Sequence, residues 1–458
     1  MEETKKVPHD DWALLLETAK EAARDYLSDL ENRSVNLLPQ AEDTLDRLAE
    51  EMPIEGSPAL DVLKQLISLG RTSTILSTGP NYYGFVTGGA LPIALAARWL
   101  SDVWDQNAAL EVMSPLSARL ENLVEQWLIE LLGLPKQSVA GFVSGSSVAT
   151  LCALAAAREH LYQRADWPLR DRGLNGAPSI EVYGPDTLHG SIEKALRILG
   201  FGRQHMHWLK TDESGRLNPD QLPTLGPLSI LILQAGQVCT GAFDDFETLI
   251  PAAKAQGAWV HIDGAFGLWA AASKLSQPLV KGVAVADSWV TDAHKTLNVP
   301  YDSGIVFCRY GDALTKALSS SGSYLQSDRG RDGMDFTLEM SRRARAIELW
   351  ATIKSLGSDG IAELVTRFCD HAVLLHQLLE HSPYTIVSRP IFNQMLVALA
   401  DDDATTRALT ALQQSGKAWV SGAQWQGRQV IRISICNWRT EAKHIERLAH
   451  LMIEVSQA

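Results

Sequence analysis

The chain has 458 residues, of which 46% are hydrophobic and 21% are charged, and this composition excludes disordered, collagen-like and low-complexity proteins. Its 41 basic and 54 acidic residues give a net charge of −13, and no run of Lys or Arg forms a stripe that could follow a phosphate backbone. We therefore expect a soluble protein of about two domains that does not bind nucleic acid.

The five cysteines predict neither a disulfide framework nor a zinc site, because they are odd in number, widely spaced and contain no Cys-x-x-Cys pair. The N-terminal segment has no apolar stretch behind its basic residues. No segment approaches the roughly 20 apolar residues that a membrane-spanning helix needs. The sequence therefore favours a cytoplasmic protein with no metal site and no membrane partner.

The first predicted element is an amphipathic helix between about residues 10 and 32, with leucines and alanines at helical spacing. It lies outside the pattern of strands and helices that follows. Two alternatives stay open: the helix packs on a second subunit, or it lies on its own domain. A loop with several glycines and prolines, residues 76–92, then precedes the main body.

From about residue 138, short apolar runs alternate with helical segments, which is typical of parallel strands joined by helices. Ligands of such sheets bind outside the carboxyl ends of the strands, so polar residues that follow the strands are expected to form one site. The predicted strands are 140–143, 180–183, 229–233, 259–262, 288–290 and 304–308.

The C-terminal part predicts a second, smaller α+β domain after a long helical stretch that ends near His381. Its predicted strands are 384–387, 395–399 and 429–436, with a helix over 441–453. We expect three parts: an N-terminal helical dimerisation arm at 1–75, a large domain at 76–350 and a small domain at 351–458.

A serine- and glycine-rich turn, residues 144–147, separates the first predicted strand from an alanine-rich helix. Backbone N–H groups and hydroxyls at a helix N-terminus bind phosphate, which makes Gly145, Ser146 and Ser147 candidates for such a site. Simple N-capping explains the same serines and, from this turn alone, is the favoured alternative. No Gly-Lys-Ser/Thr follows, so the turn is not a Walker loop.

Two further candidates follow other predicted strands. Asp263 ends a hydrophobic strand and precedes small residues, and a protonated pyridine nitrogen would supply the cation that such an acid needs. An N-cap or a metal ligand is the alternative, but the absence of neighbouring carboxylates argues against a metal. His189 lies between a strand and a helix, where its imidazole either stacks on a cofactor ring or caps the helix.

Lys295 follows another predicted strand, beside His294, in a segment of mostly apolar or small residues. A lysine amine at the mouth of a sheet can form a Schiff base with an aldehyde, as in pyridoxal phosphate enzymes. A surface lysine is the commoner alternative for any single lysine. Only the other motifs, taken in chain order, favour the Schiff base.

In this order the motifs resemble those of the group II pyridoxal-phosphate-dependent decarboxylases, the family of aromatic-amino-acid, tyrosine, histidine, glutamate and diaminobutyrate decarboxylases. The resemblance covers about residues 80–439. It implies an α/β, aspartate aminotransferase-like fold (PLP fold type I): a mostly parallel seven-stranded sheet with helices on both faces, a small C-terminal α+β domain and an N-terminal helical arm.

The resemblance also implies residue roles in binding pyridoxal 5'-phosphate. Ser146 and Ser147, with Gly145, would bind the phosphate, and His294 would lie near it. His189 would stack on the ring, Ala265 would lie against it, and Asp263 would pair with the pyridine nitrogen. Lys295 would form the Schiff base. Lys295, His189 and Asp263 would be the catalytic residues.

The resemblance further implies an obligate homodimer, because part of the substrate pocket comes from the neighbouring subunit in this family. Residues 81–85 look like the family's pocket aromatics and residues 104–107 like a segment that lines the site. We therefore place Tyr83, Phe85 and Asn107 in the substrate pocket. Packing of the loop or of the dimer interface is an equally supported alternative for the aromatic residues.

The implied reaction is decarboxylation of an L-amino acid, releasing CO2 and an amine through the Lys295 Schiff base, although the sequence does not identify which amino acid. Gln237 and Val238 replace two threonines of the family pattern. The loop that supplies a proton-donating tyrosine in the animal enzymes has none between Tyr324 and the Arg342-Arg343 pair. A carbon–carbon lyase or an oxidative aldehyde synthase is therefore the alternative, while the complete cofactor set argues against a binding protein without turnover.

Overall fold

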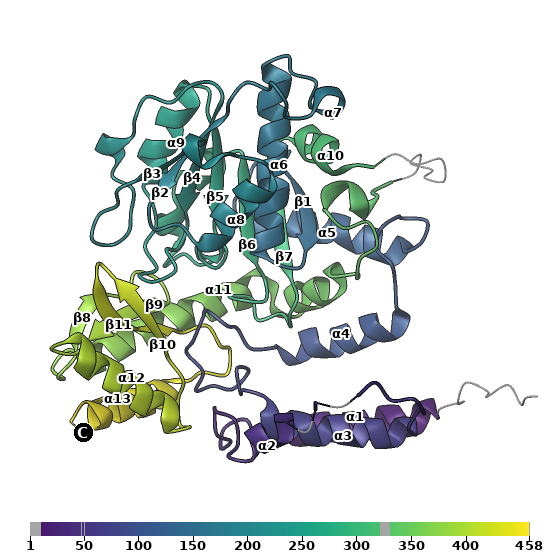
Figure 1. Ribbon diagram of the computed structural model, residues 1–458, viewed down its shortest axis with the longest axis vertical. Coiled ribbons are helices and arrows are strands. Elements are labelled where there is room, and N and C mark those ends of the chain that lie inside the picture. Colours follow the sequence, from purple (N-terminus) through teal and green to yellow (C-terminus); the bar gives the residue numbers. More distant parts are fainter. Residues whose placement is uncertain (1–10, 47, 50, 321–329, 458) are drawn as a thin grey trace, which may run out of the picture.

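A computed structural model describes residues 11–46, 48–49, 51–320 and 330–457. A large sheet with helices on both faces forms the main body, and a smaller sheet with two helices forms the C-terminal end (Figure 1). Helices α1 and α3 lie side by side, apart from the large sheet, with α4 between them and the main body (Figure 1).

The large sheet has seven strands in the order β1-β7-β6-β5-β4-β2-β3. Only β7 is antiparallel to its neighbours, β1 and β6, so the expected mostly parallel seven-stranded sheet is confirmed. The six strands predicted from sequence are present, and β3 was missed. The strands are β1 (Val139–Val143), β2 (Glu181–Pro185), β3 (Met206–Leu209), β4 (Ser229–Gln234), β5 (Trp259–Asp263), β6 (Ser288–Asp292) and β7 (Gly304–Cys308).

Successive side chains of the central strands point to opposite faces of the sheet, and both faces are covered. In β7, Ile305 and Phe307 pack with helices α5, α9 and α11, while Val306 and Cys308 pack with α6, α8 and α10. The covering helices are α5 (Pro115–Leu131), α6 (Ser146–Arg164), α7 (Leu169–Arg172), α8 (Gly190–Ile198), α9 (Phe246–Ala255), α10 (Gly311–Leu318) and α11 (Ala346–Leu379).

The C-terminal sheet is fully antiparallel, in the order β10-β11-β9-β8. Helix α11 runs from the large sheet to this smaller one, with a break at Gly357, where φ is +64°. The elements are β8 (Thr385–Ser388), β9 (Gln394–Ala398), α12 (Asp402–Gln414), β10 (Ser421–Trp425), β11 (Arg428–Ser434) and α13 (Ala442–Ser456).

The N-terminal helices are α1 (Trp12–Ser28), α2 (Ala41–Asp46), α3 (Ala59–Ser73) and α4 (Pro92–Trp104). Asp11 caps α1 by accepting the N–H of Ala13 at 2.9 Å. Neither α1 nor α3 contains a buried residue, although both are amphipathic. Their apolar faces are therefore only partly covered. No helix among the described residues is long and apolar enough to cross a membrane.

Candidate active site

Four of the segments singled out from sequence meet at the carboxyl edge of the large sheet. They are the turn between β1 and α6, the start of α8, the end of β5 and the loop after β6. Charges on Lys295 and His189 both act on the Asp263 carboxyl, and a Cβ built on Gly145 would lie 3.3 Å from the His294 imidazole. The structure therefore brings together residues that are up to 150 positions apart.

A buried carboxylate, Asp292, connects these segments. Its Oδ1 accepts the N–H of Ser146 at 2.6 Å, and its Oδ2 lies 3.1 Å from the Nζ of Lys295. The same Oδ2 lies 3.6 Å from Nε2 of His294. Sequence analysis missed Asp292 because it ended this strand at Val290, whereas β6 continues to the aspartate.

Two glycines allow the turn before α6 to lie against the start of β7. A Cβ on Gly304 would be 2.3 Å from the Cα of Gly145, so any side chain there would separate the two segments. The N-cap residue of α6 is Gly145, which has no side chain to cap the helix, and the first helical amide is bound by Asp292 instead. The hydroxyls of Ser146 and Ser147 are thus not used as caps, which contradicts the N-capping alternative.

Asp263 lies at the end of β5 and accepts the N–H of Ala265 at 3.2 Å. Burial raises the pKa of this carboxyl, and the neighbouring charges of Lys295 and His189 oppose the shift without cancelling it. A cationic ligand beside this carboxyl would favour its ionised form.

His189 is the N-cap residue of α8, and its Nδ1 accepts the N–H of Ser191 at 3.3 Å. His189 therefore caps α8, as one of the two alternatives for this residue predicts. The side chain remains exposed on the side of the site. Capping leaves the imidazole face free and fixes the orientation of the ring.

His294 is buried beside the turn, and its Nδ1 accepts the N–H of Ser303 at 3.2 Å. Its Nε2 must therefore carry the proton in the neutral ring. Burial lowers the pKa of His294, and the nearby charge of Asp292 opposes this shift without reversing it. The ring packs on Tyr301, with centroids 4.2 Å apart, and burial raises the pKa of Tyr301 to about 12.

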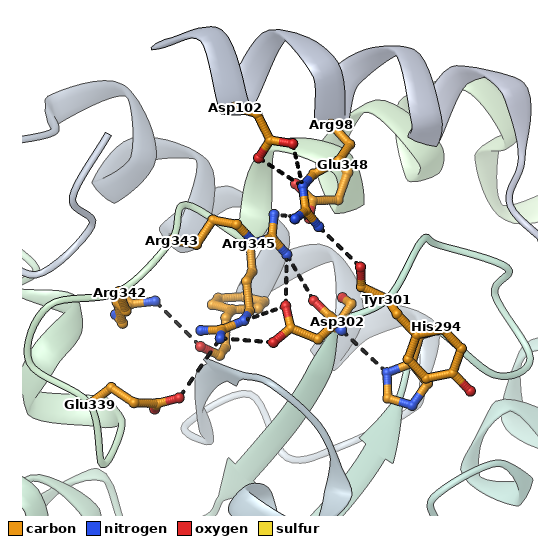
Figure 2. A network of polar contacts seen from close by, with 12 residues as sticks. Arg98, Asp102, His294, Tyr301, Asp302, Glu339, Arg342, Arg343, Arg345 and Glu348 are labelled. Atoms are coloured by element: carbon orange, nitrogen blue, oxygen red, sulfur yellow. Dashed lines mark hydrogen bonds and ion pairs between the residues drawn. The ribbon is translucent and has the colours of Figure 1, made fainter. Parts of the chain in front are cut away.

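The backbone that carries Tyr301 is held by the network of charged residues in Figure 2. Arg343 donates to the Asp302 carbonyl at 2.8 Å, and Arg345 donates to the Asp302 carboxylate at 3.1 Å. Arg98 donates to the carbonyl of Tyr301 at 3.1 Å and also pairs with Asp102. Sequence analysis noted Arg343 only as part of an arginine pair and gave it no partner.

The predicted substrate-pocket residues fall in three different environments. Tyr83 is 1% exposed, lies in the core of the C-terminal unit and donates to the carbonyl of His444, which corrects its placement in the pocket. Phe85 is 61% exposed and packs at 5.1 Å from the Trp419 ring. Asn107 accepts N–H groups of Ala109 and Arg342 at 3.1 and 3.2 Å, so it ties two loops together.

Gln237, which departs from the family pattern, and Phe336, an aromatic residue in the segment between Tyr324 and Arg342, both contact neighbouring protein groups. Gln237 is 2% exposed, and its Oε1 accepts the N–H groups of Cys239 and Thr240 at 2.6 and 2.9 Å. It therefore stabilises its own loop. Phe336 packs beneath the Arg331 guanidinium at 4.0 Å. Tyr324 lies outside the described residues.

A family model described as the pyridoxal-dependent decarboxylase conserved domain matches residues 42–398. Phenylacetaldehyde synthase of Arabidopsis thaliana is 28% identical over 365 residues, 73% of this chain and 73% of the relative. Aromatic-L-amino-acid decarboxylase of Bacillus atrophaeus is 24% identical over 458 residues, 94% of this chain and 92% of the relative.

Among solved structures, Oryza sativa TDC with PLP and tryptamine superposes with a TM-score of 0.91 at 21% identity, covering 99% of both chains. Rhodiola rosea 4-hydroxyphenylacetaldehyde synthase superposes with a TM-score of 0.86 at 23% identity, covering 98% of this chain and 99% of that one. These superpositions extend the agreement in fold over nearly the whole chain.

Proposed function

The chain belongs to the pyridoxal-dependent decarboxylase family and is a pyridoxal 5'-phosphate enzyme that decarboxylates an amino acid. On this basis we propose which residues bind the cofactor and which class of amino acid is the substrate. The geometry that supports the residue roles is the convergence of Lys295, Asp263 and the start of α6 at one edge of the sheet. The relatives named above act on, or bind, aromatic compounds, and we propose an aromatic L-amino acid as the substrate.

The residues present fit this cofactor. Asp263 is a buried carboxyl that suits a pyridinium nitrogen, and the start of α6, whose N-cap residue is a glycine, suits a phosphate. Lys295 would hold the aldehyde carbon covalently, His294 would donate from Nε2, and Ala265 leaves room for a flat ring. When bound, the cofactor supplies the electron sink for the breaking Cα–carboxyl bond.

The protein's own contribution is orientation and control of charge. His189, fixed by Ser191, presents an imidazole face to the open side of the site. Asp263 places a carboxyl at the end of β5, where its charge would stabilise a cation most when water is excluded. Lys295 Nζ remains beside Asp292 whenever it is not covalently engaged, so the amine stays close to the reacting atoms.

We further propose that the protein is a homodimer whose subunits share the substrate pocket. Large apolar side chains lie exposed along α1, α3, α4, the loop that follows and the start of α5, and exposed apolar surface of this extent is typical of an interface. The residues are Trp12, Leu14, Leu16, Leu27, Val62, Leu66, Ile93, Trp99, Leu100, Val103, Trp104, Val112, Met113 and Leu116. In this proposal, residues 1–75 are the dimerisation arm, and 76–350 and 351–458 are the large and small domains.

A cytoplasmic location also belongs to the proposal. Its support is that all five cysteines, within the part of the chain that the structure describes, are unpaired, as expected in a reducing compartment. Four of them are buried.

Oxidative release of an aldehyde is the second candidate reaction. Its support is that three of the relatives are named aldehyde synthases, together with the absence of a tyrosine between Tyr324 and Arg342. Both reactions begin by losing CO2, so CO2 alone does not separate them. The amine keeps the substrate nitrogen, whereas the aldehyde releases it as ammonia.

The test is a panel of L-amino acids with the holoenzyme, in which CO2, amine, aldehyde, ammonia and peroxide are quantified together by mass spectrometry and coupled assays. We expect CO2 and amine in equal amounts from an aromatic substrate. Equal amounts of aldehyde, ammonia and peroxide instead would establish the second reaction. Absence of CO2 with every substrate, from protein that carries the cofactor, would contradict both.

A further inference from the structure

The first amide of α6 already has an anionic acceptor within the chain. Ser146 is the first residue of this helix, and its N–H donates to Asp292 Oδ1 at 2.6 Å. A helix N-terminus carries partial positive charge and free N–H groups, which is why it binds phosphate. In this protein a carboxylate occupies part of that position.

The other oxygen of the same carboxylate holds the reactive lysine. Asp292 Oδ2 lies 3.1 Å from Lys295 Nζ, and the aspartate side chain is 2% exposed. Other titratable groups near it are His294, whose Nε2 is 3.6 Å away, and Asp263 and Tyr301, whose pKa values its charge raises. One buried carboxylate therefore satisfies both an amide of the phosphate-binding turn and the lysine.

Asp292 is fixed by its backbone as well as by its side chain. Its N–H donates to the Ala265 carbonyl at 2.8 Å, and its own carbonyl accepts the Trp269 indole N–H at 3.2 Å. The backbone therefore cannot retreat from the turn without breaking the end of β6. Only a rotation of the side chain could release Ser146 and Lys295.

We propose that Asp292 is a positioning residue that substitutes for the cofactor phosphate, holding the Ser146 amide and the Lys295 amine in the cofactor-free protein and opposing phosphate binding through its charge. The inference rests on the proposed cofactor roles. It predicts that the carboxylate weakens binding of a phosphate-bearing ligand and preserves the position of the lysine in the empty site.

The test separates the phosphate from the aldehyde by using two ligands that lack an aldehyde. Pyridoxine 5'-phosphate carries the phosphate, and pyridoxine does not. Cofactor-free wild type and Asp292→Asn are titrated with each, and binding is followed by calorimetry. We expect Asp292→Asn to bind pyridoxine 5'-phosphate at least about tenfold more tightly than wild type, because the substitution removes a negative charge that repels the phosphate. Pyridoxine has no phosphate, so its affinity should stay within about twofold of wild type.

A second measurement tests the hold on the lysine. With pyridoxal 5'-phosphate, the first-order rate of covalent capture at saturating ligand, followed by visible absorbance, should fall at least about threefold in Asp292→Asn. Asp292→Glu, which keeps the charge, should restore weak binding of pyridoxine 5'-phosphate. If Asp292→Asn does not fold, Asp292→Ser supplies the neutral variant and should also bind pyridoxine 5'-phosphate more tightly.

Asp287→Asn is the matched control, since Asp287 precedes the other end of β6 and also joins a lysine, Lys254, to a backbone amide, that of Val260. It should leave the affinity for pyridoxine 5'-phosphate unchanged. Equal or weaker binding of this ligand by both neutral Asp292 variants would overturn the inference. If wild type forms no covalent complex with pyridoxal 5'-phosphate, the proposed role of Lys295 fails instead, and the two failures are distinct.

Discussion

Replacing Glu121 with Gln should destabilise the fold by about 3–5 kcal/mol, because it leaves a buried guanidinium without its counter-charge. Glu121 is 1% exposed and lies 2.6 Å from Nη2 of Arg342, whose side chain is also 1% exposed. Among the described residues, the Arg342 guanidinium has one other hydrogen bond, to the Phe142 carbonyl at 3.4 Å. This weak contact cannot compensate for the lost carboxylate.

The size of the loss follows from what each arginine retains. Arg331 also approaches Glu121, at 3.6 Å, but it keeps Glu125 at 2.6 Å and is therefore still paired in the variant. The penalty falls on Arg342 alone. A loss of 3–5 kcal/mol is a large share of the roughly 5–15 kcal/mol by which proteins are stable.

The assay is the midpoint of equilibrium urea unfolding of the holoenzyme, with Glu17→Gln as control. Glu17 forms an exposed pair with Lys20 at 2.8 Å, and its loss should cost under about 1 kcal/mol. The double variant Glu121→Gln with Arg342→Met removes the unpaired charge and should recover part of the stability. A loss below about 1 kcal/mol in Glu121→Gln, or no recovery in the double variant, would refute the reasoning.

Three further predictions concern the lysine, the interface and pH. Lys295→Ala should abolish both the visible absorbance of bound cofactor and CO2 release, whereas Lys281→Ala, at an exposed lysine, should retain both. Trp99→Glu should convert the dimer to a monomer, as measured by light scattering, whereas Leu275→Glu, at an exposed leucine outside the N-terminal helices, should leave the dimer intact. If both variants are dimers, α4 is not part of the interface. Burial raises the pKa of the Asp244 carboxyl to about 7, so the stability that this group contributes is present below about pH 4 and is lost as the pH rises through 7. The urea midpoint of wild type should therefore fall more between pH 5 and pH 8 than that of Asp244→Asn. Parallel falls in the two proteins would contradict this sign.

The site could be located from sequence because its residues follow the general rule for open parallel sheets. Asp263 and Lys295 each come just after an apolar run, and such positions meet at one edge whatever the loops between them do. The order of these motifs along the chain then gave the resemblance to the decarboxylase family, and that resemblance implied the pyridoxal phosphate chemistry. What the pattern could not provide was any distance between side chains, since that depends on register and on helix packing.

The strands that were missed have weak patterns of their own. Strand β3 is four residues long and includes His207 and Trp208, while β10 alternates Gly422 and Gln424 with less polar residues. Their hydrogen-bonding partners, β2 and β11, determine their structure more than their own propensity does. Short edge strands of this type leave little trace in a single sequence.

The aromatic loop shows a second limit, because its residues share composition but not environment. Tyr82 stacks on Trp419 at 5.1 Å, whereas Tyr83 enters the small-domain core. The difference arises because Tyr83 N–H donates to the Trp419 carbonyl at 2.8 Å, which directs neighbouring side chains to opposite sides. A segment more than 330 positions away thus decides which of the two aromatic side chains enters the small-domain core.

A boundary error of two residues has the largest functional consequence. Aspartate is a poor strand former, and the predicted strand ended at Val290. The pairing with β7 nevertheless continues through Thr291 to the register Asp292↔Gly304 and extends β6 to the aspartate. With the strand two residues longer, Asp292 becomes the polar residue at the carboxyl end, the same position that identified Asp263 on β5. The rule that found one acid would therefore have found the other had the strand end been known, and strand ends are fixed by partner strands rather than by local propensity.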